Sequence, residues 1–314
     1  MPGLLTVLDE LLTEETAGDP ISGLKWTHKS LRKIQSALPP GYSVSLPTIS
    51  RLLQERDYSL RVNHKRVAGK QSPHRDKQFR YIVRWRQAYL RHRWPVISVD
   101  AKKSELIGNF KQPGQEWRQQ RREVNMYDFL NSAQGKAIPY GIYDIAHNHG
   151  YVRVGTSHNT AEFAVAAIWD WWVKRARLLY PHEKHLLIQA DGGGSNGSRC
   201  KLWKVGLQCL ADEFGLIITV THYPTGASKW NLIEHRMFNL MSANWAGHPL
   251  DSYDTLLNFI RTTTSTTGFC CQADLDTTIY ETGITVSEEE LAQVRIRPHR
   301  RFPNWNYTIY PHSK

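Results

Sequence analysis

The chain has 314 residues, which is long enough for about two domains. Hydrophobic residues make up 40% of it, so a substantial core can form, and no apolar run approaches the ~20 residues of a membrane span. The chain carries 40 Lys and Arg against 29 Asp and Glu, a formal net charge of +11. This excess, with an isoelectric point near 9.5, points to a polyanionic partner.

The cysteines and the N-terminus indicate a cytosolic protein. The four cysteines are Cys200, Cys209, Cys270 and Cys271, and they include no pair of CxxC motifs with zinc-ligand spacing. We interpret them as reduced thiols rather than as a disulfide framework. The first fifteen residues contain four acids and no basic run, so they do not resemble a signal peptide.

Residues 1–60 predict a small helical region. Leucines at helical spacing predict one helix over residues 4–12, a second is expected from a cap at Thr27 to about Ala37, and a third from Ser45 to about Arg56. A Pro/Gly turn joins the last two helices, so the pair resembles a helix-turn-helix, although a generic helical bundle is the alternative. The side chains that could contact base edges or phosphates are Thr48, Ser50, Arg51 and Gln54.

Residues 61–93 carry nearly the whole charge excess. They contain eleven Lys and Arg and a single acid, Asp76. The first part, which includes Lys65 and Arg66, predicts a basic linker. The second predicts a helix over residues 76–91, with arginines between its apolar positions. A solvated helix face is the bland interpretation, but the charge density favours a surface that follows DNA phosphates.

Three acidic residues stand at positions where chemistry is usually placed. Asp100 ends the apolar strand 95–100, and Asp191 ends a second apolar run just before three glycines, which let the backbone turn sharply. Glu234 lies in a helical pattern over residues 229–245. Its predicted stripe is otherwise apolar: Trp230, Met237, Phe238, Met241 and Trp245. A buried carboxylate must be protonated, paired or bound to a cation, so three of them at one sheet edge suggest a divalent metal site.

The predicted element order gives a fold class. After the Asp100 strand come a long connection over 103–135, a hairpin over 137–155, and a helix from a cap at Asn159 to about Leu179. The Asp191 strand, a helix over 200–214, a strand over 216–221 and the Glu234 helix follow. This α/β order is the ribonuclease H-like layout, a mixed sheet with flanking helices. Asp144 also ends an apolar strand and is a rival ligand.

Several segments resemble a known family. They read VISVDAKKSELIGNFK, GKAIPYGIYD, ADGGGSNGSR and SKWNLIEHRMF. These are similar to bacterial insertion-sequence transposases of the ISAzo-thirteen family, whose catalytic part is a DDE domain of ribonuclease H-like fold. The resemblance runs from about Leu24 to Tyr310, and its start is shorter than the family leads us to expect. It implies that Asp100, Asp191 and Glu234 are the catalytic triad.

The resemblance also implies a reaction and its partners. Two Mg²⁺ or Mn²⁺ ions would be held, with Asp100 bridging both and Asp191 and Glu234 each holding mainly one. DNA would be cut at the element ends, and the freed 3′-hydroxyl would attack target DNA, in a synaptic homo-oligomer in the bacterial cytoplasm. Lys102 and Lys103 could neutralise phosphate charge, and Asn196 and Lys229 could position the DNA backbone.

We therefore expect four parts. They are a helical DNA-binding region (1–60), a basic linker and helix (61–93), a ribonuclease H-like catalytic domain with the 103–135 insert (94–250), and a C-terminal extension (251–314), predicted to hold helices over 253–263 and 286–294 and an extended piece over 305–310. Two alternatives to an active transposase stay open. One is an inactive remnant that only binds DNA, and the other is a ribonuclease H-like nuclease without strand transfer.

Overall fold

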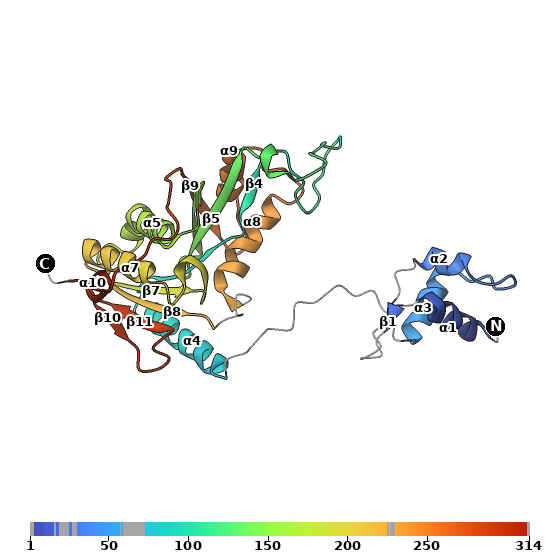
Figure 1. The fold of residues 1–314 in the computed structure, drawn as a ribbon, viewed down its shortest axis with the longest axis horizontal. Helices are drawn as coiled ribbons and strands as arrows, with labels where there is room; N and C mark the ends of the chain where they lie inside the picture. Colours follow the sequence, from blue (N-terminus) through green and yellow to red (C-terminus); the bar gives the residue numbers. More distant parts are fainter. Residues whose placement is uncertain are drawn as a thin grey trace. The chain divides into compact units, whose positions relative to one another are not determined.

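The computed structural model describes residues 3–15, 17–18, 25–26, 30–56, 58, 73–224, 226 and 230–312. By contacts the chain forms two compact units, residues 1–67 and residues 68–314 (Figure 1). No helix in the described ranges is long and apolar enough to cross a membrane.

The N-terminal unit is helical, as predicted. It contains α1 (Leu4–Glu15), α2 (Leu31–Ser36), α3 (Leu46–Glu55) and a small antiparallel ladder of β1 (Ala17–Gly18) and β2 (Lys25–Trp26). Leu8, Ile34 and Ile49, one from each helix, share its core. The predicted cap at Ser45 is confirmed, since its hydroxyl accepts a hydrogen bond from the Thr48 amide at 3.4 Å. The predicted cap at Thr27 is wrong: Ser30 accepts from the Lys33 amide and caps α2.

The second unit is a mixed sheet flanked by helices. Its strands are β3 (Val96–Ala101), β4 (Glu105–Ile107), β5 (Gly135–Asp144), β6 (His149–Gly155), β7 (His185–Ala190), β8 (Ile217–His222), β9 (Cys270–Asp276), β10 (Ile296–Pro298) and β11 (Asn306–Ile309). Its α-helices are α4 (Arg75–Arg91), α5 (Ala161–Trp171), α6 (Arg177–Leu179), α7 (Lys201–Phe214), α8 (Asn239–Asn244), α9 (Tyr253–Arg261) and α10 (Glu288–Ala292). Within the described residues it also contains the π-helical turns η2 (Trp172–Ala176) and η5 (Glu234–Phe238) and the 3₁₀ turns η1 (Leu130–Ser132) and η3 (Gly194–Asn196).

The strand order confirms the predicted fold class. Within the described residues the sheet runs β10-β11-β8-β7-β3-β5-β6-β9, and β4 pairs with β5 off this path. The strands β3, β5 and β6 form an antiparallel meander, while β7 and β8 run parallel to β3. An antiparallel meander beside two parallel strands reached through helices is the ribonuclease H-like layout. The unit is therefore an α/β domain of that fold class.

Helices cover both faces of the sheet (Figure 1). Alternation along β3 sends Ile97 and Val99 into the core beneath α5 and α7, and sends Val96 to the opposite face, against Tyr89 of α4. The η5–α8 helix and α9 pack on that second face over β5 and β6. The predicted helix beginning at Asn159 is present, but Thr160 caps it, since the Thr160 hydroxyl accepts a hydrogen bond from the Phe163 amide at 3.2 Å.

The C-terminal residues belong to the sheet, which the sequence did not predict. β9 pairs in parallel with β6, and β11 pairs antiparallel with β8. The α4 helix also packs on this sheet. Grouping the chain by contacts places one boundary between residues 67 and 68, and the four predicted parts stay a prediction.

The 103–135 connection is ordered at its base and exposed beyond it. Its only strand in the described part of the chain is β4. The Arg122 guanidinium donates to Asp251 at 2.8 Å and ties the segment to the loop before α9. Five large apolar side chains are exposed on it: Trp117, Met126, Tyr127, Phe129 and Leu130.

Candidate active site

Asp100 lies near the end of β3 and is held by two hydrogen bonds. The Ala101 amide donates to its Oδ1 at 2.8 Å, and the Asn231 side-chain amide donates to its Oδ2 at 3.1 Å. Opposite it on β5 is Gly141, where a Cβ would lie 2.5 Å from the Phe238 ring. A glycine is required there so that the helix carrying Glu234 can pack directly on the sheet beside Asp100.

Asp191 follows β7 directly, beside Asp100. Because Val99 pairs with Ala190 in the parallel ladder, the two aspartates are the next residues along neighbouring strands. The Gly192 amide donates to Asp191 Oδ1 at 2.6 Å, which fixes the carboxylate as the chain turns away. Gly194 has a φ of 71°, a left-handed conformation that glycine adopts without strain.

Glu234 begins the π-helical turn η5, a feature found frequently at functional sites. Met237, Phe238, Met241 and Trp245 of the predicted stripe are buried. Trp230 is the exception, since 48% of its surface is exposed and its ring lies under the Arg75 guanidinium at 4.3 Å. The prediction that Trp230 packs on the sheet is therefore wrong, because the chain becomes helical only after it.

The three carboxylates influence one another electrostatically. Burial raises the pKa of Asp100 to about 7, and the charges of Asp191 and Glu234 contribute to this rise. The pKa of Glu234 is also raised, by burial and by Asp191, although His235 and Lys102 oppose the rise. A cluster in which carboxylates resist ionisation is a cluster that a cation would stabilise.

The carboxylates do not by themselves enclose an ion. Among the described residues, no group of three His, Cys, Asp or Glu side chains is close enough to hold a metal. Mg²⁺ in proteins is commonly bound by one or two carboxylates, with waters and substrate phosphates completing its shell. The donor set of oxygen atoms from Asp100, Asp191 and Glu234 fits a cation of that kind, with further oxygen ligands completing its shell.

Asn231 is a residue of this site that the sequence reasoning missed. It is fully buried, and the Ser98 hydroxyl donates to its Oδ1 at 2.5 Å. This bond leaves the Asn231 NH₂ group facing Asp100. Its signal in the sequence is its place three residues before Glu234, one turn along the same segment. It connects the strand of Asp100 to the helix of Glu234.

Comparisons with known proteins agree with this fold. A family model described as the Rhodopirellula transposase DDE domain matches residues 7–311. The chain belongs to this family of DDE transposases. A comparison with curated proteins finds no match.

Solved structures of the Mos1 transposase show a more distant similarity to this chain. The Mos1 transposase paired-end complex with the left transposon end is 13% identical, with a TM-score of 0.45 over 81% of this chain and 69% of that one. The Mos1 mariner paired end complex with Mn is 14% identical, with a TM-score of 0.44 over 81% and 69%. The Mos1 Strand Transfer Complex is 13% identical, with a TM-score of 0.43 over 81% and 68%.

The predicted lysines and Asn196 differ in their accessibility. Lys102 donates to Glu105 at 2.7 Å and lies 4.6 Å from the centre of the Trp245 ring, whereas Lys103 is exposed. Asn196 is buried, and its backbone carbonyl faces the His222 Nε2 atom at 2.9 Å. Its placement suits fixing the loop after Asp191 better than touching DNA. Lys229 lies outside the described residues.

The rival ligand Asp144 ends β5, three residues beyond Gly141, and pairs with Ile97 rather than with Asp100. Its carboxylate is fully buried and accepts hydrogen bonds from the Tyr180 hydroxyl at 3.0 Å, while His147 Nδ1 lies at 2.9 Å. The same carboxylate accepts from the Ala146 amide in the β5–β6 turn. We interpret Asp144 as the residue that closes this hairpin.

The predicted DNA-contacting residues of the N-terminal unit lie on α3. Arg51 is exposed, and its guanidinium lies 3.8 Å from Glu55 one turn further along. Ser50 is partly exposed, and the Thr48 hydroxyl is 2.9 Å from that of the cap Ser45, so it is already in use. Lys65 and Arg66 lie outside the described residues.

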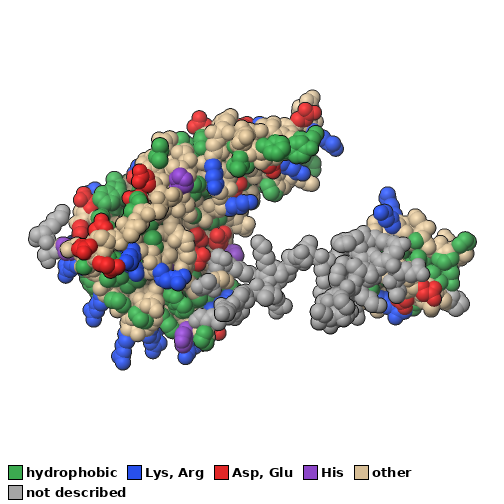
Figure 2. All heavy atoms as spheres, in the orientation of Figure 1, with side chains coloured by type: hydrophobic (Ala, Val, Ile, Leu, Met, Phe, Trp, Pro, Cys, Tyr) green, Lys and Arg blue, Asp and Glu red, His purple; other side chains and the backbone are tan. Residues whose placement is uncertain are grey.

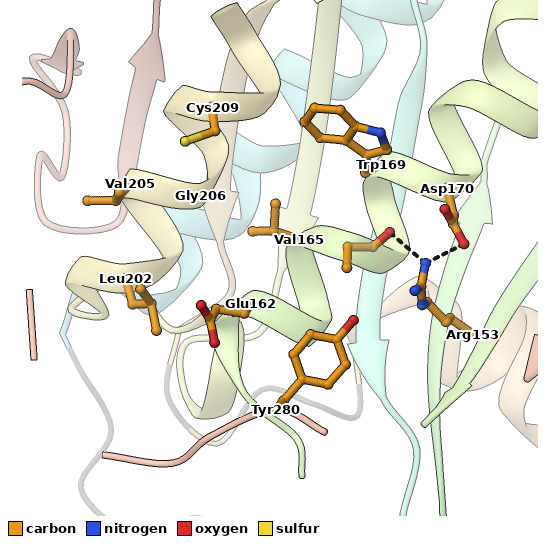
Figure 3. Close-up of a pocket in the computed structure, with 11 residues that line it drawn as sticks. Arg153, Glu162, Val165, Trp169, Asp170, Leu202, Val205, Gly206, Cys209 and Tyr280 are labelled. Carbon is orange, nitrogen blue, oxygen red and sulfur yellow. Dashed lines mark hydrogen bonds and ion pairs between the residues drawn. The ribbon is translucent and has the colours of Figure 1, made fainter. Parts of the chain in front are cut away.

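A separate cavity of about 500 Å³ lies between α5 and α7 (Figure 3). Val165, Trp169 and Leu202 give it an apolar lining, and Arg153 points towards Asp170 and the Ala166 carbonyl. None of the three clustered carboxylates lines it. The cavity is therefore distinct from the candidate active site.

Proposed function

We propose that this protein is an active DNA transposase that cuts DNA at the ends of an insertion sequence and joins those ends to target DNA. The observation that carries the proposal is the placement of three acids from three separate elements. Asp100 and Asp191 stand at the ends of the neighbouring parallel strands β3 and β7, and the helix of Glu234 packs over Gly141, the partner of Asp100.

Each residue has a proposed role. The oxygens of Asp100, Asp191 and Glu234 would hold two divalent cations, Mg²⁺ or Mn²⁺. Such ions stabilise the attacking and leaving oxygens of an in-line phosphoryl displacement. Asn231 keeps the Asp100 carboxylate in one orientation, and the Gly192 amide does the same for Asp191. Lys103, which is exposed beside the site, would bind a DNA phosphate.

The proposed partners are duplex DNA and a second copy of the chain. Element ends and target DNA would both be substrates, and two ends would be held together in a homo-oligomer. The α3 helix of the N-terminal unit, with Ser50 and Arg51 on its accessible side, is the proposed reader of the end sequence.

The test compares the parent with Asp100→Asn, Asp191→Asn and Glu234→Gln on a labelled duplex that carries an element end, in Mg²⁺. Each variant keeps the shape of the side chain and removes its negative charge. We expect cleavage to fall by orders of magnitude, as happens when catalytic groups that act as a unit are removed. Glu234→Gln should fold normally and melt at or above the parent temperature without metal, because it removes a partly buried charge.

Three outcomes would change the proposal. Cleavage by Glu234→Gln within a few-fold of the parent would remove Glu234 from the site. Cleavage by the parent without any joining of the freed 3′-hydroxyl to target DNA would identify a nuclease. DNA binding with neither reaction would identify an inactive remnant.

A further inference from the structure

The helix α4, the strand β10 and the loop after β10 together carry a strongly basic surface. We name as the basic ridge six exposed cations: Lys77, Arg80 and Arg84 on α4, and Arg297, Arg300 and Arg301 on β10 and the loop after it. The three on α4 recur at three- and four-residue spacing and so share one stripe of the helix. In the space-filling view, Lys and Arg side chains protrude along the lower rim of this unit, where Figure 1 labels β10 and α4 (Figure 2).

The side chain of His299 links the two halves of the basic ridge, and we call its contacts the histidine clasp. The His299 ring stacks on Trp85 of α4 with 4.8 Å between ring centres. Its Nδ1 lies 2.9 Å from the Tyr81 hydroxyl, and its Nε2 lies 2.9 Å from the Thr308 hydroxyl on β11. Arg297 pairs with Thr308 in the β10–β11 ladder and so lies on the same side of the sheet as α4. β10 and β11 form what we call the C-terminal hairpin. The histidine clasp therefore places the arginines of this hairpin and the loop within it beside the cations of α4.

The six cations of the basic ridge form no ion pair with an Asp or Glu in the part of the chain that the structure describes. The ion pairs of this unit are formed by other basic residues, such as Lys102, Arg153 and Lys174. Burial lowers the pKa of His299 to about 4, and the charge of Arg297 contributes to this. Like charges held together repel, and a polyanion would relieve that repulsion.

The helix α4, which carries half of the basic ridge, also reaches towards the candidate active site. Near its start, α4 carries Arg75 over the Trp230 ring and Phe79 at 5.7 Å from it. Trp230 is only four residues before Glu234. A duplex lying along α4 would therefore extend towards the three carboxylates.

We propose that the basic ridge binds the sugar–phosphate backbone of duplex DNA, with the C-terminal hairpin as half of the binding surface. This inference rests on the proposed function, because the bound duplex would be the substrate of the nearby site. Contacts of this kind supply affinity and orientation but carry no sequence information. The C-terminal residues thus contribute to DNA binding and do not merely close the sheet.

The test measures binding of a random-sequence DNA duplex to the full chain at several salt concentrations, in EDTA so that no cleavage occurs. The variant carries Arg297→Gln, Arg300→Gln and Arg301→Gln. The control carries Lys136→Gln, Arg177→Gln and Lys184→Gln, three exposed cations on other elements, and loses the same charge. Three lost phosphate contacts should reduce the slope of log affinity against log salt by about 2 to 3 and weaken binding on the order of 10- to 100-fold. The control should keep the parent slope.

Each outcome supports or overturns the further inference, and one of them also overturns the proposed function. A reduced slope in the variant alone supports the inference. Equal losses in variant and control, or no loss in either, would overturn the inference while leaving the proposed function standing. A parent that binds no duplex at all would overturn both. As a check on folding, the variant should melt at or above the parent temperature at low salt, since it removes repulsion without removing an ion pair.

Discussion

Asn231 shows how one side chain can orient a carboxylate of the candidate site. It accepts a hydrogen bond from Ser98 and donates one to Asp100, so an amide is the side chain whose two ends match both neighbours. An aspartate at the same position could still accept from Ser98. Its other oxygen would face the Asp100 carboxylate, where a donor had been.

We expect Asn231→Asp to lower the free energy of unfolding in the absence of divalent cations. The change removes a buried hydrogen bond and adds charge repulsion, a loss of about 2 kcal/mol or more. Ser98→Ala is the control, because it leaves the bond to Asp100 in place and should cost about 1 kcal/mol. The measurement is thermal melting with and without Mn²⁺, which should restore part of the loss in Asn231→Asp only. An aspartate variant as stable as the parent without metal would contradict this role.

Single residues also show what the sequence can reveal about the site. Strand alternation and the apolar stripe were enough to select Asp100, Asp191 and Glu234, because each is a charged group where burial is expected. Asn231 was not predicted as a site residue, because a single amide does not stand out from the hydrophobic pattern of its segment. Its role depends on Asp100, which lies 131 residues away in the sequence. Trp230 was misjudged because helical spacing says nothing about where the helix begins.

At the scale of elements, the strand β9 was not predicted because contacts with distant parts of the chain define it. The buried positions of β9 include Ala273 and Asp276, residue types that are depleted in strands, so the segment carries little strand signal. The strand is fixed by long-range contacts instead. Its last residue, Asp276, accepts hydrogen bonds from Arg153 of β6 at 2.7 Å and from the Tyr280 hydroxyl at 2.8 Å. Such contacts cannot be read from a local window of sequence.

We expect Asp276→Asn to destabilise the protein in a way that depends on pH. Burial raises the pKa of Asp276, but the hydrogen bonds from Arg153 and Thr278 outweigh it and lower that pKa to about 2. A carboxylate with a lowered pKa stabilises the fold above its unfolded pKa, near 3.8, and this stabilisation is lost as the pH falls towards 2. The variant should lose about 1 to 2 kcal/mol at neutral pH and little near pH 2.

Denaturant melts of parent and variant at several pH values give the test. Asp274→Asn is the control on the same strand. Its ion pair with Lys174 is 2.8 Å long but 41% exposed on the Asp274 side, so solvent screening should leave its loss well below 1 kcal/mol. A loss for Asp276→Asn that stayed constant from neutral to acidic pH would show that packing, rather than charge, accounts for it.

At the scale of the whole molecule, the element order predicted the fold class because most of its elements carry a clear local signal of helix or strand. The hairpin and the helices of residues 94–245 appear in the predicted order, and that order fixes the mixed sheet. The joining of residues 270–309 to both edges of the sheet was not predictable in the same way. Those pairings link segments about 90 to 120 residues apart, as Thr219 with Thr308 and Arg153 with Asp274 show, and several edges could have accepted them.

The candidate site and the DNA surface should bind their ligands cooperatively. Three carboxylates that do not enclose an ion alone need phosphate oxygens to complete the shell of a metal, so Mn²⁺ should bind weakly without DNA. Calorimetry with a non-hydrolysable duplex should show Mn²⁺ affinity rising at least tenfold, or about 1.4 kcal/mol of coupling. Coupling is reciprocal, so Mn²⁺ should strengthen duplex binding by the same factor. Glu234→Gln should lose this coupling while keeping its metal-free DNA affinity, because the basic ridge is unchanged. Equal Mn²⁺ affinity with and without DNA would mean that the metal and the phosphates do not share one site.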